Sequence, residues 1–367
     1  MVHAWNEVTP HAEWSSRAEF STASSLETGT VLVLGGRIVT QTLPPGAPIA
    51  VPIVTVLGDV WRSDDRGGSW RCVNTNASAS PGGGWRARSS AAAFLTEAQR
   101  IVLIGGSYPT SDGSNTLLND VWHSDDMGEH WTLVDATVPF AGRIHAMGAT
   151  ARVIIDDART GRPSAVLVAM GSTQQSPGVL DKLWQSADDG ATWRLVASDI
   201  ARTTWARAVP TMVAGGLDGR TLIIAFGNAA NFDAYGPYYS DVWRSRDGGA
   251  TLALAISQSP ATATFPIARV KAALALLVVD AEPGSAATNA SVERLFVAGG
   301  RVGGIQLNDA WTCDLALKSR GGTCVWRQGA AFPGGKRWGM GAVPVRSAAA
   351  GGGRRRRGGH DDPHPGR

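Results

Sequence analysis

Short apolar runs that end in glycine recur along the chain. They lie at 31–36, 101–106, 166–171, 222–227 and 295–300, and each is rich in aliphatic and β-branched residues. Runs of this length that stop at glycine indicate buried strands rather than helices. We therefore expect one buried strand at each of these five positions.

A second segment follows each run and opens on an aspartate with a tryptophan close behind it. Segments 58–70, 119–131, 180–193 and 240–252 align, the third being one residue longer at its start. A fifth copy begins at 308–313, carries an insertion and resumes at 322–326. The shared aspartates recur about every 60 residues, which is a repeat period typical of propellers; they are Asp59, Asp120, Asp181, Asp241 and Asp309.

A third segment precedes each apolar run. It begins with an arginine, usually near an aromatic residue, and continues into an apolar or alanine-rich stretch; the arginines are Arg17, Arg88, Arg143, Arg207, Arg269 and Arg337. Each unit thus predicts four short strands, and a four-stranded repeat of this length is a propeller blade. Stacked blades bury each other's faces, and tryptophan supplies much of that area.

The predicted fold is all-β: a β-propeller of four-stranded blades, five complete plus an incomplete sixth closed by N- and C-terminal strands. Residues 337–345 would supply the first strand of the sixth blade and residues 4–8 its last, while its two middle strands are absent. Either the ring keeps an incomplete blade or the chain is a truncated or mis-spliced product, and we favour the second. The propeller spans 1–346, and the Gly/Arg-rich tail 347–367 is expected to be disordered.

These segments resemble two known repeat types. A Gly-Gly strand followed by an Asp-x-Trp strand is similar to the kelch motif of the galactose oxidase central domain. The polar turn resembles the Asp box (BNR repeat) of sialidases, Ser-x-Asp-x-Gly-x-Thr-Trp. Short polar side chains bond nearby backbone in such turns, so we interpret the boxes as structural. Their residues are Ser63, Asp65, Gly67, Ser124, Asp126, Gly128, Ser186, Asp188, Gly190, Ser245, Asp247 and Gly249.

Composition narrows the function classes. The net charge is +3, and four of the positive charges form one run at 354–357 in the tail, so a nucleic-acid partner has little electrostatic support. No apolar stretch approaches the roughly 20 residues of a membrane span, and no signal peptide is visible. Disulfide reach between Cys313 and Cys324, and glycosylation sequons at Asn76 and Asn289, hint at a secretory origin. The localisation stays open.

The candidate ligand-binding residues fall into two groups. The six arginines named above would form a ring near the channel mouth that suits a carboxylate, phosphate or acidic peptide. The alternative, which we favour, is that each arginine ties one blade's backbone to its neighbour. Aromatic residues in the loops between second and third strands would suit sugar stacking or a protein partner, unless they simply cover a blade; they are Tyr108, Phe232, Tyr235, Tyr238 and Tyr239.

No catalytic constellation can be placed. The resemblance to sialidases implies an Arg-Ile-Pro stretch and a Tyr–Glu pair, and the resemblance to galactose oxidase implies a Tyr–Cys crosslink with histidines; neither set is found. His145 is the one histidine of interest, and a structural role is favoured for it. We expect a non-enzymatic, monomeric module that binds a protein or glycan on its loop face, without metal or cofactor. The alternative is a sialidase-like glycoside hydrolase with unidentified catalytic residues.

Overall fold

A computed structural model describes residues 6–140, 150–153, 165–172, 179–197, 211–215, 221–228, 237–256, 266–280, 291–315 and 326–331, apart from gaps at 26–27, 44, 47, 80–82, 97–98, 113, 248 and 267. Within these ranges, side chains are not described at 150–182, 197, 214–215 and 280. Within these residues, no helix is long and apolar enough to cross a membrane.

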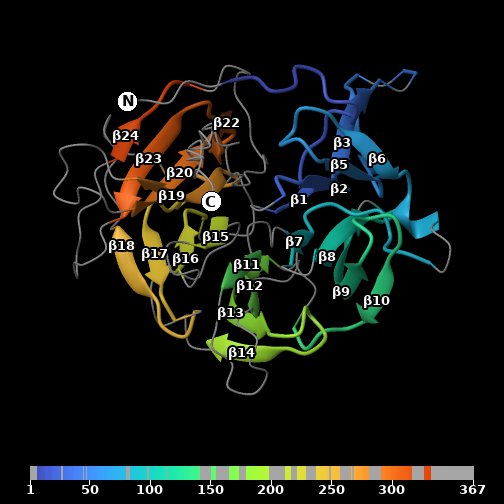
Figure 1. The fold of residues 1–367 in the computed structure, drawn as a ribbon. Helices are drawn as coiled ribbons and strands as arrows, with labels where there is room; N and C mark the ends of the chain where they lie inside the picture. Colours follow the sequence, from blue (N-terminus) through green and yellow to red (C-terminus); the bar gives the residue numbers. More distant parts are fainter. Residues whose placement is uncertain are drawn as a thin grey trace, which may run out of the picture.

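The described residues form five four-stranded sheets arranged about a common axis (Figure 1). The first holds β1 (Ser21–Ser24), β2 (Val31–Leu34), β5 (Val60–Ser63) and β6 (Arg71–Asn74), and the second holds β7 (Ala92–Leu95), β8 (Ile101–Pro109), β9 (Asn115–Ser124) and β10 (Thr132–Asp135). The third holds β11 (Thr150–Val153), β12 (Ala165–Ser172), β13 (Val179–Ser186) and β14 (Arg194–Ala197). The fourth holds β15 (Thr211–Gly215), β16 (Thr221–Ala225), β17 (Val242–Ser245) and β18 (Ala253–Ile256), and the fifth holds β19 (Ala273–Asp280), β20 (Ser291–Ala298), β23 (Ala310–Leu315) and β24 (Trp326–Gln328).

Each sheet is antiparallel, and its first strand lies nearest the axis. Strand β1 contacts β7, β7 contacts β11, β11 contacts β15 and β15 contacts β19, so the first strands line the centre of the ring (Figure 1). The loops before the first strand and between the second and third strands therefore share one face, here called the arginine face. The turns between the third and fourth strands lie on the opposite face.

The cores lie between neighbouring sheets, as stacking requires. One cluster joins Phe94 and Val121 of the second sheet to Leu183 of the third and Ile224 of the fourth. Similar clusters join the first sheet to the second and the fourth to the fifth. A single sheet could not bury these side chains, so the stability of each sheet depends on packing against its neighbour.

Two additional hairpins project from the arginine face. Strands β3 (Arg37–Thr42) and β4 (Val51–Val56) form one between β2 and β5, and β21 (Arg301–Val302) and β22 (Ile305–Gln306) form the other between β20 and β23. A short 3-10 turn, η1 (Ala77–Ala79), follows β6. Isolated bridges join Ala18 to Arg37 and Val270 to Arg301, so each hairpin base lies beside the entry to a first strand.

The all-β, propeller-like architecture is confirmed. The sixth blade is not seen. Its expected strand at 337–345, residues 4 and 5 of the expected strand 4–8, and the tail 347–367 lie outside the described residues, and the described residues 6–8 form no strand. Within the described part, no sheet combines strands from both ends of the chain. The blade count and the closure by terminal strands therefore stay predictions.

Candidate functional site

Each described arginine of the repeat forms an ion pair with the shared aspartate of its own unit. Arg88 donates to both carboxylate oxygens of Asp120, at 2.6 and 2.8 Å, and to the carbonyl of Gly105 at 2.7 Å. The indole of Trp122 donates to the same carboxylate at 2.6 Å. We call this arrangement the brace, and it recurs as Arg17–Asp59 with Trp61 and as Arg269–Asp309 with Trp311.

The braces are buried, and their electrostatics favour the charged forms. The Arg88 side chain is 2% exposed and its Asp120 partner 15%. Burial raises the pKa of Asp120, but hydrogen bonds and the charge of Arg88 outweigh burial, so the pKa lies below its ordinary value. The pKa of Asp309 is also lowered: burial raises it, and the hydrogen bond and charge of Arg269 lower it further. These carboxylates stay ionised as partners of arginine.

The braces engage the arginines that the structure describes, and both the ligand ring and the tie between blades stay predictions. The guanidinium groups of Arg17, Arg88 and Arg269 are buried against an aspartate of their own sheet, so they do not point to a ligand. The backbone and the side chain of these arginines make different contacts. The backbone of Arg88 joins the first sheet by accepting from Gly36 at 3.0 Å and donating to Leu57 at 3.1 Å. Arg143, Arg207 and Arg337 lie outside the described residues.

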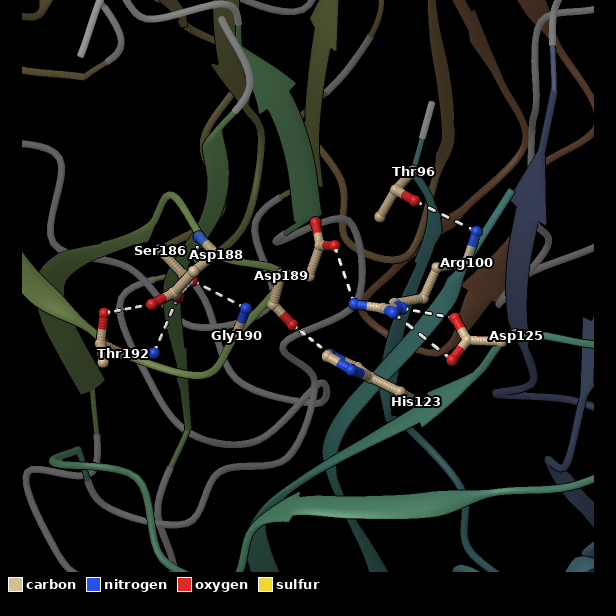
Figure 2. A network of polar contacts seen from close by, with 9 residues as sticks. All are labelled: Thr96, Arg100, His123, Asp125, Ser186, Asp188, Asp189, Gly190 and Thr192. Carbon is tan, nitrogen blue, oxygen red and sulfur yellow. Dashed lines mark hydrogen bonds and ion pairs between the residues drawn. The ribbon is translucent and has the colours of Figure 1, made fainter. Parts of the chain in front are cut away.

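The polar turns on the opposite face bond as the Asp-box interpretation expects. Ser186 Oγ donates to Asp188 at 2.8 Å and accepts from the Gly190 amide at 2.7 Å. Asp188 accepts in addition from the Thr192 amide at 2.8 Å and hydroxyl at 2.6 Å (Figure 2). The equivalent Ser-to-Asp and Gly-to-Ser bonds recur in the turns that begin at Ser63, Ser124 and Ser245.

These bonds hold the turn aspartates as anions. The amide and hydroxyl of Ser69, together with Ser63, lower the pKa of Asp65 to about 2. For Asp126, Asp188 and Asp247, burial raises the pKa, and bonds from the turn lower it further than burial raises it. Each carboxylate accepts hydrogen bonds from its own turn.

The turn glycines also touch the preceding sheet, which sequence analysis missed. A Cβ on Gly128 would lie 2.6 Å from Val60 of the first sheet, one on Gly190 would lie 2.8 Å from Val121 of the second, and one on Gly249 would lie 2.2 Å from Leu183 of the third. All three glycines have positive φ. Their lack of a side chain therefore serves both the turn and the approach of neighbouring sheets.

The aromatic residue near each arginine packs on the tryptophan that ends the polar turn. Trp85 meets Trp131 edge-on at 5.7 Å, and Trp14 meets Trp70 at 5.8 Å. Phe140 meets Trp193 in the same way at 5.0 Å. These pairs explain why an aromatic residue accompanies the arginine, and they make it part of the packing.

Polar contacts across the second and third sheets surround one polar turn. Arg100 donates to Asp125 at 2.6 Å and to Asp189 at 3.4 Å, and Nε2 of His123 makes a short contact with the Asp189 carbonyl (Figure 2). Burial lowers the pKa of His123, and the Arg100 charge adds to that effect, while the Asp189 carbonyl opposes it. The histidine is therefore a structural bridge in its neutral form.

The tyrosines that the structure describes are held by other residues. The guanidinium carbon of Arg86 lies 3.7 Å from the centroid of the Tyr108 ring, and the Tyr238 hydroxyl accepts from the Gly303 amide at 3.0 Å. The amide of Tyr239 donates to the carbonyl of Gly227. These contacts favour covering of the blade over sugar stacking. Phe232 and Tyr235 lie outside the described residues.

Metal and redox candidates are few within the described residues. Asp126, Glu129 and His130 are exposed and bring ligand atoms within 4.8 Å of one another, but Asp126 already accepts from His130 and Ser124 within its turn. We therefore assign no metal to them. Cys313 is disulfide-bonded and Cys72 is a free thiol. Cys324, Asn289 and His145 lie outside the described residues, whereas Asn76 of the other sequon is exposed.

The β3–β4 hairpin is the exposed apolar feature of the arginine face, and sequence analysis missed it. It carries five of the eleven exposed large hydrophobic residues of the described chain, which are Val39, Leu43, Ile49, Val51 and Ile53. No charged residue occurs from 38 to 58. Residues 38–42 and 51–56 are rich in Ile, Val and Thr, which could have indicated two strands. Prolines at 44, 45, 48 and 52 obscured that pattern.

Comparison with solved structures agrees with this architecture. A structure titled "Structure of YjhT" matches with a TM-score of 0.55, over 91% of this chain and 89% of that one, at 12% sequence identity. The chain is similar in fold to YjhT. At this identity the match shows the fold alone. No family model matches, and no curated protein matches, so the kelch and Asp-box resemblances rest on the motifs themselves.

Proposed function

We propose that this chain is a non-enzymatic propeller that binds a protein partner on its arginine face through the β3–β4 hairpin. The observation that carries the proposal is the exposed, uncharged surface of that hairpin, with Ile49 71% and Ile53 47% exposed. The register places Val51 and Ile53 on one face of the hairpin and Val39 on the other, so both faces carry exposed apolar side chains. Exposed apolar surface of this kind marks an interaction site. Natural edge strands are usually protected by charge, and the segment 38–58 has none.

The described residues favour a protein over a glycan. Sugar binding relies on aromatic faces, and those of Tyr108 and Tyr238 are engaged by Arg86 and the β21–β22 turn. The hairpin surface is aliphatic, which suits apolar side chains of a partner. A membrane surface is disfavoured because the segment 38–58 lacks the aromatic and basic residues of interfacial anchors.

The alternative of a sialidase-like hydrolase gains no support from the described site residues. Such chemistry needs two carboxylates about 5–10 Å apart in one pocket. The aspartates of the braces and of the polar turns are bound within their own sheets. Glu19, a carboxylate near the axis, accepts hydrogen bonds on both of its oxygens.

The test begins with a photo-crosslinking amino acid placed at Val39, with the same group at Leu133, on β10, as the matched control. Both positions are exposed, at 53% and 44%. A protein crosslinked from Val39 alone would then be purified and titrated calorimetrically. We expect the double substitution V39K/I53K to weaken that binding at least about 100-fold, and Leu133→Lys to leave it unchanged.

The outcomes separate the two functions. Equal weakening by V39K/I53K and Leu133→Lys would show that the hairpin is not the binding surface. Glycoside hydrolysis by the purified chain, unaffected by the hairpin substitutions, would favour the enzyme. Circular dichroism of each variant shows whether the propeller remains folded.

A further inference from the structure

Glu19 is buried beside the axis, at a position that repeats in other units. It is the second residue after Arg17, as Ser90 follows Arg88 and Lys271 follows Arg269. All three have positive φ, between 55° and 57°. Non-glycine residues rarely adopt this conformation, and it persists where the surroundings hold it. The position therefore directs polar side chains toward one another at the mouth of the ring.

Three donors converge on the Glu19 carboxylate. Lys271 Nζ donates to Oε1 at 2.9 Å, Arg37 Nη2 donates to the same oxygen at 2.7 Å, and Ser90 Oγ donates to Oε2 at 3.0 Å. Glu19 is 2% exposed and Lys271 6%. The donors come from the entry to the fifth sheet, the base of the β3–β4 hairpin and the entry to the second sheet.

Backbone bonds join the first sheet to the second and the fourth sheet to the fifth in the described residues. Gly36 of the first sheet donates to Arg88 of the second, and Gly227 of the fourth donates to Arg269 of the fifth. The first and fifth sheets are instead joined by side chains, through Glu19 and Lys271, which are 252 residues apart.

We infer that Glu19 is an axial latch: its ion pair with Lys271 ties the first sheet to the fifth, and its bond to Arg37 holds the base of the β3–β4 hairpin. This inference does not depend on what the hairpin binds. Removal of Glu19 would leave both cations without a counter-charge in a poorly hydrated site, whereas removal of Lys271 or Arg37 breaks one of its two ion pairs. The carboxylate therefore holds two parts of the fold together: the first sheet to the fifth through Lys271, and the base of the β3–β4 hairpin through Arg37.

The first test is a double-mutant cycle with Glu19→Gln, Lys271→Met and the double variant, read by urea unfolding. We expect Glu19→Gln to lower the folding equilibrium constant roughly 100-fold or more, because Lys271 and Arg37 would lose their common counter-charge. The double variant should lose much less than the product of the two single effects. If the two single effects on the folding equilibrium constant simply multiply in the double variant, the latch is contradicted. The control is Arg62→Met, which removes an exposed ion pair with Asp64 inside the first sheet.

The second test is hydrogen exchange, which remains informative if Glu19→Gln is too unstable to purify. Lys271→Met should raise exchange in β1 and β19 and leave β16, on the fourth sheet, unchanged. Arg37→Met should raise exchange in β3 and β4 while β19 stays protected. Equal increases throughout the ring in both variants, or increases confined to the mutated residue, would contradict a latch with two separable arms.

Discussion

Arg88 and Asp120 lie 32 residues apart in sequence and meet in a two-bond ion pair within one sheet. The pair ties the entry to β7 to the middle of β9, across β8. Because the Trp122 indole and the Gly105 carbonyl complete the hydrogen bonding, the buried charges are satisfied on both sides. Such a pair fixes strand register as well as contributing stability.

Replacing Arg88 with Met should destabilise the fold by about 3–5 kcal/mol, because Asp120 would keep a charge without its partner. Urea denaturation monitored by tryptophan fluorescence measures the loss. Arg62→Met is the matched control, since its pair with Asp64 is exposed and should contribute less than about 1 kcal/mol. A loss no greater than the control's would show that the brace is dispensable.

Gly249→Ala should cost about 2–4 kcal/mol, because the new methyl group would collide with Leu183 and the backbone has a φ of +94°. Gly46→Ala is the control: its φ is +79°, but nothing lies within 4 Å of the added carbon. The difference between the two isolates the cost of the collision. Combining Gly249→Ala with Leu183→Ala should cost less than the sum of the separate effects; simple additivity would contradict contact between the sheets.

His123 should make stability depend on pH below neutrality. Its folded-state pKa lies below the ordinary value of 6.5, mainly because of burial. The unfolded chain therefore takes up the proton first as pH falls. This contribution to stability is complete above pH 6.5 and is lost as pH falls through the folded-state pKa. Thermal unfolding at a series of pH values should show a flatter profile for His123→Gln. An unchanged profile would exclude His123 as the titrating group.

Ser69→Ala should raise the pKa of Asp65 from about 2, because the variant loses one hydroxyl donor to that carboxylate. An NMR titration of the carboxyl carbons measures the shift. Asp112, whose pKa is also about 2 through bonds from Thr110 and Ser114, is an internal reference that should not move. Since the folded-state pKa of Asp65 lies below 3.8, its stabilising effect is present above that pH and lost as pH falls toward 2. Parallel shifts of both aspartates would show a global change instead.

The strands and the polar turns could be predicted from the sequence, because both depend on local patterns. The run at 31–36 became β2, and the Ser186 turn bonds as its residue types imply. The partners of the arginines could not be predicted. Arg17 and Asp59 are 42 residues apart but Arg88 and Asp120 only 32, because the β3–β4 hairpin lengthens the first unit.

The glycine contacts and the axial cluster could not be predicted for a different reason. The positive φ of a turn glycine can be predicted, because a glycine in a polar turn indicates that conformation. The approach of Gly128 to Val60 depends on how two sheets stack, which no local pattern encodes. Glu19 and Lys271 meet only because the ring brings residues 252 positions apart together.

Each brace has both of its halves inside one repeat, and this has a consequence for how such a chain can lengthen. A tandem duplication of that stretch would carry a matched arginine and aspartate into the copy. The new unit would therefore arrive with its buried charges already balanced, and no compensating substitution would be required in the units beside it.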